Sequence, residues 1–139
     1  MSPPAGLPDL FIDRSLGRIK VPQLLRAAGL RLTTLAERYG IPADEDVADE
    51  DWLRDAGERG EVVFMKDERI RYRPAEKHVV TAAAVRAFCL SRRDLDADAM
   101  AALFLDNLTR IAEISAREQA CLYVISFVGL RRVDLTSSP

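Results

Sequence analysis

The sequence predicts an α/β protein, a three-layer α/β/α sandwich around a mostly parallel sheet. Short apolar runs that suit buried strands alternate along the 139 residues with segments whose apolar residues recur at helical spacing. Two of these runs end beside an acid: Leu10–Ile12 is followed by Asp13, and Val62–Met65 by Lys66 and Asp67. Because open α/β sheets bind ligands beyond the carboxyl ends of their strands, the same pattern predicts where a functional site lies.

The first strand is followed by a helix and a second strand. Apolar residues at helical spacing predict a helix from Val21 to Ala28, with Pro22 in its first turn and Gly29 just past its end. Leu30 to Leu35 alternates loosely, which predicts the second strand.

An acidic run, Asp44–Asp51, separates the second strand from the next helix, and we expect it to be a solvated loop. Asp49 is expected to be the N-cap of that helix, because an apolar stripe follows it. The stripe consists of Trp52, Leu53 and Ala56. Gly57 and Gly60 end the helix before the third strand, Val62–Met65.

The second half of the chain continues the alternation of helices and strands. Glu68–Arg73 is expected to be a loop or a helix entry, Pro74 to Ala83 a helix, and Val85–Leu90 a fourth strand. The longest helix begins at a group of acids and has one apolar face: Ala101, Phe104, Leu105, Leu108, Ile111 and Ala112. Cys121–Val128 is expected to be the last strong strand, with Arg131–Val133 pairing beyond it.

The composition is that of an ordinary soluble globular protein. Hydrophobic residues make up 48% of the chain, charged residues 30%, and the formal net charge is -2, so any nucleic-acid role depends on a local basic patch. The apolar runs are too short to span a bilayer and the start lacks the features of a signal peptide, so we expect a cytoplasmic protein. We expect a loose leader over residues 1–8, one domain over 9–135 and a tail over 136–139.

Three acids stand at positions that favour a metal site: Asp13, Asp49 and Asp67. Clustered carboxylates repel one another unless a cation lies between them, and oxygen ligands suit magnesium or manganese. Each acid also has an ordinary structural explanation, because aspartate is common at N-caps and in turns. We expect the start of the Asp49 helix and the end of the next strand to lie at opposite ends of the sheet, unless the stretch Pro42–Arg54 lets Asp49 fold back.

Two segments carry a family resemblance. The first is Leu10–Asp13, and the second runs from Asp49 to Asp67 with Trp52, Leu53, Ala56 and Gly60 at fixed spacing. From about Leu10 to Ile70 the chain resembles the PIN-domain family, and within it the short toxins of the VapC type. The resemblance implies a compact α/β/α sandwich in which Asp13, Asp49 and Asp67 are the metal ligands and catalytic residues.

The resemblance also implies a function. PIN domains of this type are Mg²⁺- or Mn²⁺-dependent endoribonucleases that act as the toxin of a toxin–antitoxin pair, and the ion activates water for phosphodiester hydrolysis. The implied partners are an RNA substrate and a cognate antitoxin that covers the acidic site or places an arginine or lysine in it. A homodimer through the Ala101–Ala112 helix or the last strands is left open.

Two departures from the family pattern leave alternatives open. Many PIN domains carry a further glutamate on a helix between the first and third acids, and no such helical glutamate is evident in this sequence. Glu45, Glu50 and Asp51 are the candidates that could replace it as the fourth acid. The family tends to have Ser or Thr two residues before the last acid, where this chain has Met65. The alternative function is therefore a non-catalytic PIN-like interaction module. A receiver-like phosphoacceptor domain is disfavoured because no second acid adjoins Asp13.

Basic residues follow the two strands that end beside acids. The candidates for binding substrate phosphates are Arg14, Arg69, Arg71 and Arg73, with Tyr72 available to stack a base. The alternative is that these arginines form a solvated face paired to Glu68 and Glu76.

The remaining reactive side chains are expected to be structural. Cys89 and Cys121 lie in apolar runs without CxxC spacing, which is typical of buried thiols in a reducing compartment. His78 has no partner at metal-ligand spacing, which favours a position on a helix surface.

Overall fold

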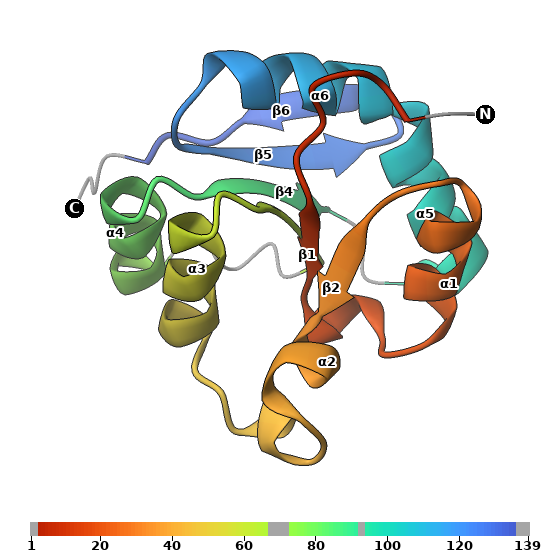
Figure 1. Cartoon of the computed structure of the whole chain (residues 1–139). Helices are drawn as coiled ribbons and strands as arrows, with labels where there is room; N and C mark the ends of the chain where they lie inside the picture. Colours follow the sequence, from red (N-terminus) through yellow and green to blue (C-terminus); the bar gives the residue numbers. More distant parts are fainter. Residues whose placement is uncertain (1–2, 67–72, 92–93, 136–139) are drawn as a thin grey trace.

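The computed structural model describes residues 3–66, 73–91 and 94–135. The described residues form a six-stranded sheet with the order β2-β1-β3-β4-β5-β6 (Figure 1). The strands are β1 Leu10–Ile12, β2 Leu32–Thr34, β3 Val62–Met65, β4 Arg86–Leu90, β5 Cys121–Ser126 and β6 Gly129–Arg132. Neighbouring strands are parallel except for the antiparallel pair β5–β6. The predicted α/β class and the mostly parallel sheet are confirmed.

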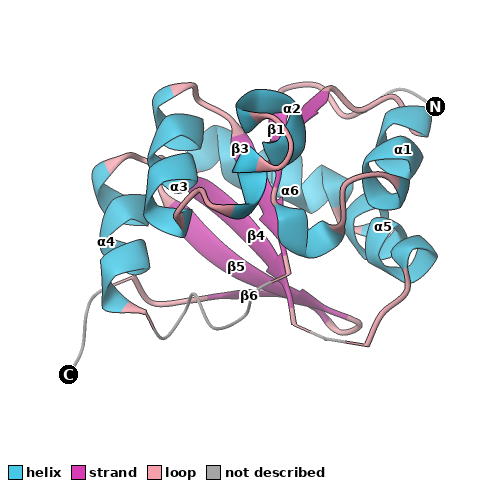
Figure 2. Ribbon diagram, turned by 90° about the horizontal axis from the view of Figure 1, so that it is seen from below, coloured by secondary structure: helices cyan, strands magenta, loops and turns pink. Residues whose placement is uncertain are grey.

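Helices cover both faces of the sheet. They are α1 Lys20–Ala27, α2 Leu35–Tyr39, α3 Asp49–Glu58, α4 Pro74–Ala82, α5 Ala97–Asp106 and α6 Leu108–Arg117, with short 3₁₀ helices η1 Arg14–Leu16 and η2 Ala43–Glu45. Figure 2 shows α3 and α4 on one side of the strands and α1 and α5 on the other. Within the described ranges no helix has the length and apolar composition needed to cross a membrane.

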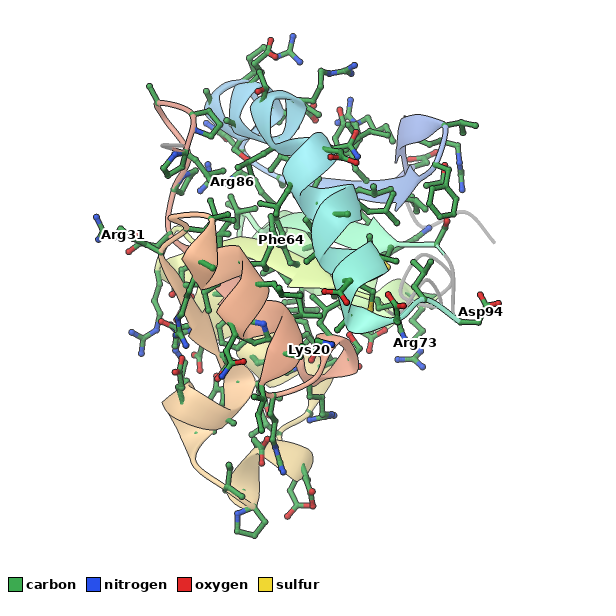
Figure 3. All side chains as sticks on the ribbon, turned by 90° about the vertical axis from the view of Figure 1, so that its right-hand side faces the viewer. Lys20, Arg31, Phe64, Arg73, Arg86 and Asp94 are labelled. Atoms are coloured by element: carbon green, nitrogen blue, oxygen red, sulfur yellow. The ribbon has the colours of Figure 1, made fainter. Side chains whose placement is uncertain are left out.

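Alternation along the buried strands divides the core between the two faces. In β1, Leu10 and Ile12 pack with residues of α1, α5 and α6, whereas Phe11 packs with residues of α2, α3 and α4. Phe11 stacks on Trp52 of α3 with ring centroids 5.6 Å apart. Phe64, in the middle of the molecule in Figure 3, stacks on Phe104 of α5 at 4.1 Å on the other face. Aromatic pairs therefore anchor one helix to each side of the sheet.

The predicted second strand was too long, and a helix was missed. β2 ends at Thr34, and α2 begins at the next residue, Leu35. The Thr34 hydroxyl accepts a hydrogen bond from Glu37 N at 3.0 Å, and the Glu37 carboxylate accepts one from Thr34 N at 2.9 Å. This reciprocal capping box favours a helix over a continued strand.

The predicted longest helix is two helices. Asn107 ends α5 and precedes α6, and its side-chain amide donates a hydrogen bond to Leu103 O at 2.7 Å. The local bond competes with helix continuation, as is typical of asparagine. The predicted last strand was also too long, because the chain turns at Phe127 and Val128 between β5 and β6. The predicted pairing of residues beyond Gly129 is confirmed by Tyr123 opposite Arg132.

Candidate metal centre

The carboxyl ends of β1 and β3 form the switch point of the sheet. From β1 the chain passes through α1 to β2, and it then returns through α3 to β3 on the other side of β1. Figure 2 shows α1 and α3 on opposite sides of the strands. The two connections run over opposite faces of the sheet, and at such a switch point the crevice in which α/β sheets bind ligands is expected beyond the carboxyl ends of the two strands. Asp13 lies at this crevice, and its backbone N–H still donates to Phe64 O of β3 at 3.1 Å.

Asp13 presents one satisfied and one unsatisfied carboxylate oxygen. The side chain caps η1: Oδ2 accepts hydrogen bonds from Ser15 Oγ at 2.6 Å and from Ser15 N at 3.3 Å. The residue is only 5% exposed, and Oδ1 is buried without a hydrogen-bond partner in the described part of the chain. A buried carboxylate oxygen without a donor is costly unless a cation or a proton satisfies it.

Ser15 ties the loop after β1 to the loop after β3. While its hydroxyl donates to Asp13, its oxygen accepts a hydrogen bond from Lys66 N at 2.9 Å. Lys66 immediately precedes Asp67, the third predicted acid, which lies outside the described residues. The sequence analysis missed Ser15, although its position two residues after Asp13 fits an aspartate-capped turn.

Asp49 lies at the same edge of the sheet as Asp13. Its Oδ1 is 3.8 Å from Arg14 Nη2, and the charge of Asp49 raises the pKa of Asp13. The expectation that the start of this helix and the end of β3 lie at opposite ends of the sheet was wrong. α3 leads into the parallel strand β3 and therefore runs antiparallel to it, which brings the first turn of the helix to the carboxyl end of the strand.

Asp49 is also not the N-cap of α3. Ala48 occupies the cap position, and Asp49 is the first helical residue. Its carboxylate accepts a hydrogen bond from Trp52 Nε1 at 3.0 Å, which leaves the side chain held over the first turn rather than bonded to the helix backbone. The indole of Trp52 is fully buried in the core, so the helix packing fixes where the Asp49 carboxylate lies.

Glu76 is a further acid of the site, and the sequence analysis did not assign it there. It lies in the first turn of α4 and is 6% exposed. Its carboxyl group hydrogen-bonds with that of Asp49, and Arg73 Nη1 donates to Glu76 Oε1 at 3.1 Å. The pairing of an arginine with Glu76 was anticipated as an alternative, but burial of the pair against Asp49 follows from how α4 packs on α3.

Burial and the neighbouring acid Asp49 raise the pKa of both Asp13 and Glu76. Burial, followed by the charge of Asp49, raises the pKa of Asp13 above its ordinary value, and the hydrogen bonds from Ser15 oppose the shift. For Glu76, burial and the hydrogen bond with Asp49 raise the pKa to about 7, and Arg73 opposes the shift. Added positive charge at this edge would therefore be stabilising.

The donor chemistry fits a hard divalent cation. Asp13, Asp49 and Glu76 supply carboxylate oxygens, and Asp13 Oδ1 is an orphaned buried acceptor that a cation would satisfy. Among the described residues, however, no three acid, histidine or cysteine side chains are already arranged around one cation position. Arg73 Nη1 instead lies 3.3 Å from Asp49 Oδ2 and 3.1 Å from Glu76 Oε1.

The predicted substrate arginines divide into two groups. Arg14 donates to Asp44 O at 2.6 Å and faces Asp49, and Arg73 pairs with the acids, so both make contacts within the site. Figure 3 shows Arg73 on the side of Asp94 and away from Arg86, which begins β4. The other predicted residues of this group lie outside the described ranges: Arg69, Arg71 and Tyr72.

The acidic run before α3 is not uniformly solvated as expected. Asp44 is fully buried, and both of its carboxylate oxygens accept hydrogen bonds from Arg18, at 2.8 and 2.9 Å. Of the fourth-acid candidates, Glu45, Glu50 and Asp51 are exposed, and Glu45 pairs with Arg18 at 3.2 Å.

The side chains expected to be structural lie as predicted. Cys89 and Cys121 are both buried, and burial raises the pKa of Cys121 to about 12, which makes it a poor nucleophile. His78 is exposed on α4.

Comparison with known proteins identifies the family. A family model described as a PIN-like domain matches residues 8–92, which include both strands of the crevice. The chain belongs to the PIN-like domain family. It is 39% identical over 121 residues to the Mycobacterium tuberculosis protein named "Putative ribonuclease VapC45", across 87% of this chain and 88% of that protein. No solved structure matches the chain.

The family match confirms the resemblance to PIN domains, and the mostly parallel sheet with helices on both faces agrees with the α/β/α sandwich that the resemblance implied. Met65, which the sequence analysis singled out as a departure from the family pattern, has a structural explanation. In this PIN-like domain Met65 is 1% exposed and packs in the core with Trp52 and Val63. The hydroxyl nearest to Asp13 is instead that of Ser15, which reaches Lys66 from the neighbouring loop.

Proposed function

We propose that this PIN-like domain is a metal-dependent endoribonuclease that acts as the toxin of a toxin–antitoxin pair. One observation carries the proposal: Asp13 Oδ1 is buried and unpartnered among the described residues, at the crevice where Asp49 and Glu76 also lie. An acceptor of that kind is stabilised by a cation. The identity with a protein named as a VapC ribonuclease supports the same function.

The residues that would hold Mg²⁺ or Mn²⁺ are Asp13, Asp49 and Asp67, and the structure describes the first two. When bound, the ion supplies an activated water and stabilises charge on the phosphate. The Ser15 hydroxyl donates to Asp13 Oδ2, so Oδ1 is the oxygen available to coordinate the ion. The Trp52 indole N–H donates a hydrogen bond to Asp49 Oδ1 and thereby fixes the orientation of that carboxylate. The protein thereby preorganises its carboxylates on buried elements.

The substrate is proposed to be RNA, bound through arginines beside the acidic site. Arg14 and Arg73 lie there, and Arg69 and Arg71 follow Asp67 in the sequence. Arginine suits phosphate because its planar fork donates two parallel hydrogen bonds. A cognate antitoxin is the proposed protein partner, and it would restrain the nuclease by covering this edge of the sheet.

Cleavage of RNA by the Asp13→Asn variant tests the proposal. With Mg²⁺ the wild-type protein should cleave a mixed RNA substrate, and the variant should lose about 100-fold or more of the rate, because the amide is a poorer metal ligand. Asp46→Asn is the control, since Asp46 is exposed on the neighbouring loop. Equal cleavage by all three proteins, or cleavage that persists in a chelator, contradicts the proposal.

The alternative, a non-catalytic PIN-like interaction module, is favoured by one contact. Arg73 already neutralises part of the acid cluster, as it would in a domain that no longer binds metal. Calorimetry separates the two functions, because a module that lost its chemistry should bind Mn²⁺ weakly or not at all.

A further inference from the structure

The guanidinium of Arg73 lies between two acids of the site. Arg73 precedes α4 as its N-cap residue, and Nη1 is 3.3 Å from Asp49 Oδ2 and 3.1 Å from Glu76 Oε1. The two acids come from different helices, α3 and α4, and one nitrogen contacts both. A single positive group that contacts two acids from separate elements occupies the position that a bridging cation takes.

The acids need this positive charge. The side chain of Glu76 is 8% exposed and that of Asp49 is 26% exposed, so when both are ionised water screens their repulsion only in part. Arg14 approaches Asp49 only to 3.8 Å and directs its shortest hydrogen bond to Asp44 O. Arg73 is therefore the closest described cation to both members of the pair.

Arg73 does not complete the site. Asp13 Oδ1 stays buried and without a hydrogen-bond partner among the described residues, although the charge of Asp49 is close enough to raise the Asp13 pKa. A divalent cation could contact Asp13 Oδ1 and Asp49 together, which a guanidinium held by Asp49 and Glu76 does not. The side chain of Arg73 is 37% exposed, so its guanidinium can move away from the two acids into solvent.

We infer that Arg73 is an internal counter-ion that competes with the divalent metal, and that the metal enters by displacing its guanidinium from Asp49 and Glu76. Glu76 is in this account the fourth acid of the site, in place of Glu45, Glu50 or Asp51. The inference deepens the proposed function and rests on its metal site. Once displaced, the guanidinium becomes available to a substrate phosphate, the role expected of Arg73 from the sequence.

Calorimetric titration with MnCl₂ at fixed ionic strength tests the inference. Arg73→Gln should bind Mn²⁺ about tenfold more tightly than wild type, because a competing cation has been removed. Lys77→Gln is the matched control: it removes one positive charge from the first turns of α4, next to Glu76, at a residue that forms no ion pair with another described residue. Its affinity should equal that of wild type. Equal affinities of Arg73→Gln and Lys77→Gln, or weaker binding by Arg73→Gln, overturn the inference.

Thermal unfolding supplies a second readout that needs no catalysis. Without metal, Arg73→Gln should melt below wild type because Asp49 and Glu76 lose their counter-ion, and added MnCl₂ should raise its Tm by more than it raises that of wild type. Glu76→Gln should bind Mn²⁺ more weakly than wild type. A Tm of Arg73→Gln above that of wild type in chelator contradicts the counter-ion role.

The outcomes separate this inference from the proposed function. Tighter Mn²⁺ binding by Arg73→Gln without RNA cleavage by any form supports the counter-ion and contradicts the nuclease. RNA cleavage by wild type together with unchanged Mn²⁺ affinity in Arg73→Gln overturns the counter-ion alone. No Mn²⁺ binding by either protein overturns both.

Discussion

At the scale of single residues, the site depends on which atoms are left without partners. Asp13 has one oxygen committed to Ser15 and one buried without a donor in the described residues. The sequence predicted Asp13 and Asp49 because acids beside strands and at helix starts form a recognisable pattern. Glu76 could not be found in that way, because an acid in the first turn of a helix is ordinary and only the packing of α4 on α3 buries it.

Removal of the Ser15 hydroxyl should weaken both the fold and the site. Ser15→Ala removes the 2.6 Å bond to Asp13 Oδ2, which keeps only the 3.3 Å bond from the backbone N of residue 15, and it removes the hydroxyl that accepts from Lys66 N. We therefore expect a loss of about 1–2 kcal/mol in the free energy of unfolding and weaker Mn²⁺ binding. Urea denaturation and calorimetry measure the two effects. Ser126→Ala is the control, since that hydroxyl accepts one bond at 3.3 Å in the exposed β5–β6 turn. Indistinguishable behaviour of the two variants contradicts the role of Ser15.

At the scale of elements, the sequence predicted where most helices and strands lie better than it predicted the residues at which they begin and end. The apolar periodicity located the strands and most helices, and Pro74 at the start of α4 and Gly29 after α1 fall where the sequence indicates. α2 was missed although Thr34 and Glu37 form a capping box that is visible in the sequence. The break at Asn107 was missed because the apolar face of α5 continues into α6 without a change of spacing.

The packing of α3 on α4 depends on the absence of a side chain at Gly57. A Cβ there would overlap Ala83 O and approach Val85 Cγ2 to 2.9 Å. Helix propensity alone predicts that Gly57→Ala stabilises the protein by about 1 kcal/mol. We expect the opposite sign, a loss of about 1–3 kcal/mol from overpacking.

Urea denaturation of Gly57→Ala shows whether the substitution raises or lowers the free energy of unfolding. Glu58→Ala is the control, at an exposed position of the same helix. Because α4 carries Glu76, we also expect Gly57→Ala to weaken Mn²⁺ binding. A stabilised variant would show that α4 can shift away from α3 at little cost.

At the scale of the whole molecule, the sheet topology brings distant residues to one edge. β1 and β3 are neighbours, α1 follows β1 on one face, and α3 leads into β3 on the other face. Asp13, just past the end of β1, and Asp49, in the first turn of α3, therefore lie at one edge although 36 positions separate their numbers. The strand ends predicted that Asp13 and Asp67 share this edge, and Asp67 lies outside the described residues. For Asp49 the sequence predicted the opposite end of the sheet unless Pro42–Arg54 let it fold back. The direction of α3 was judged wrongly, and Asp44 was taken for a solvated acid because its partner Arg18 is distant in sequence.

The Arg18–Asp44 pair holds the segment before α3 against η1, and its strength should depend on pH. Arg18 lowers the pKa of Asp44 below its ordinary value of 3.8. The pair therefore contributes its full stability above the ordinary pKa and loses it as the pH falls through the lowered one.

Thermal unfolding of Asp44→Asn across pH measures this dependence. We expect a clear loss of Tm at pH 7, and the difference from wild type should shrink as the pH falls below 3.8. Asp46→Asn should behave like wild type throughout, because Asp46 is exposed. A difference that does not change with pH would show that the ion pair is not what stabilises this segment.

The central claim is that Asp13, just past the end of β1, and Asp49, in the first turn of α3, bind one divalent cation together, with Glu76 of α4 beside them. Anomalous diffraction from a crystal soaked in MnCl₂ tests it most directly. We predict a manganese peak in contact with Asp13 Oδ1 and Asp49, with the Arg73 guanidinium moved away from Asp49. A peak elsewhere on the molecule, or no peak at saturating MnCl₂ with Arg73 still on Asp49 and Glu76, would contradict the account.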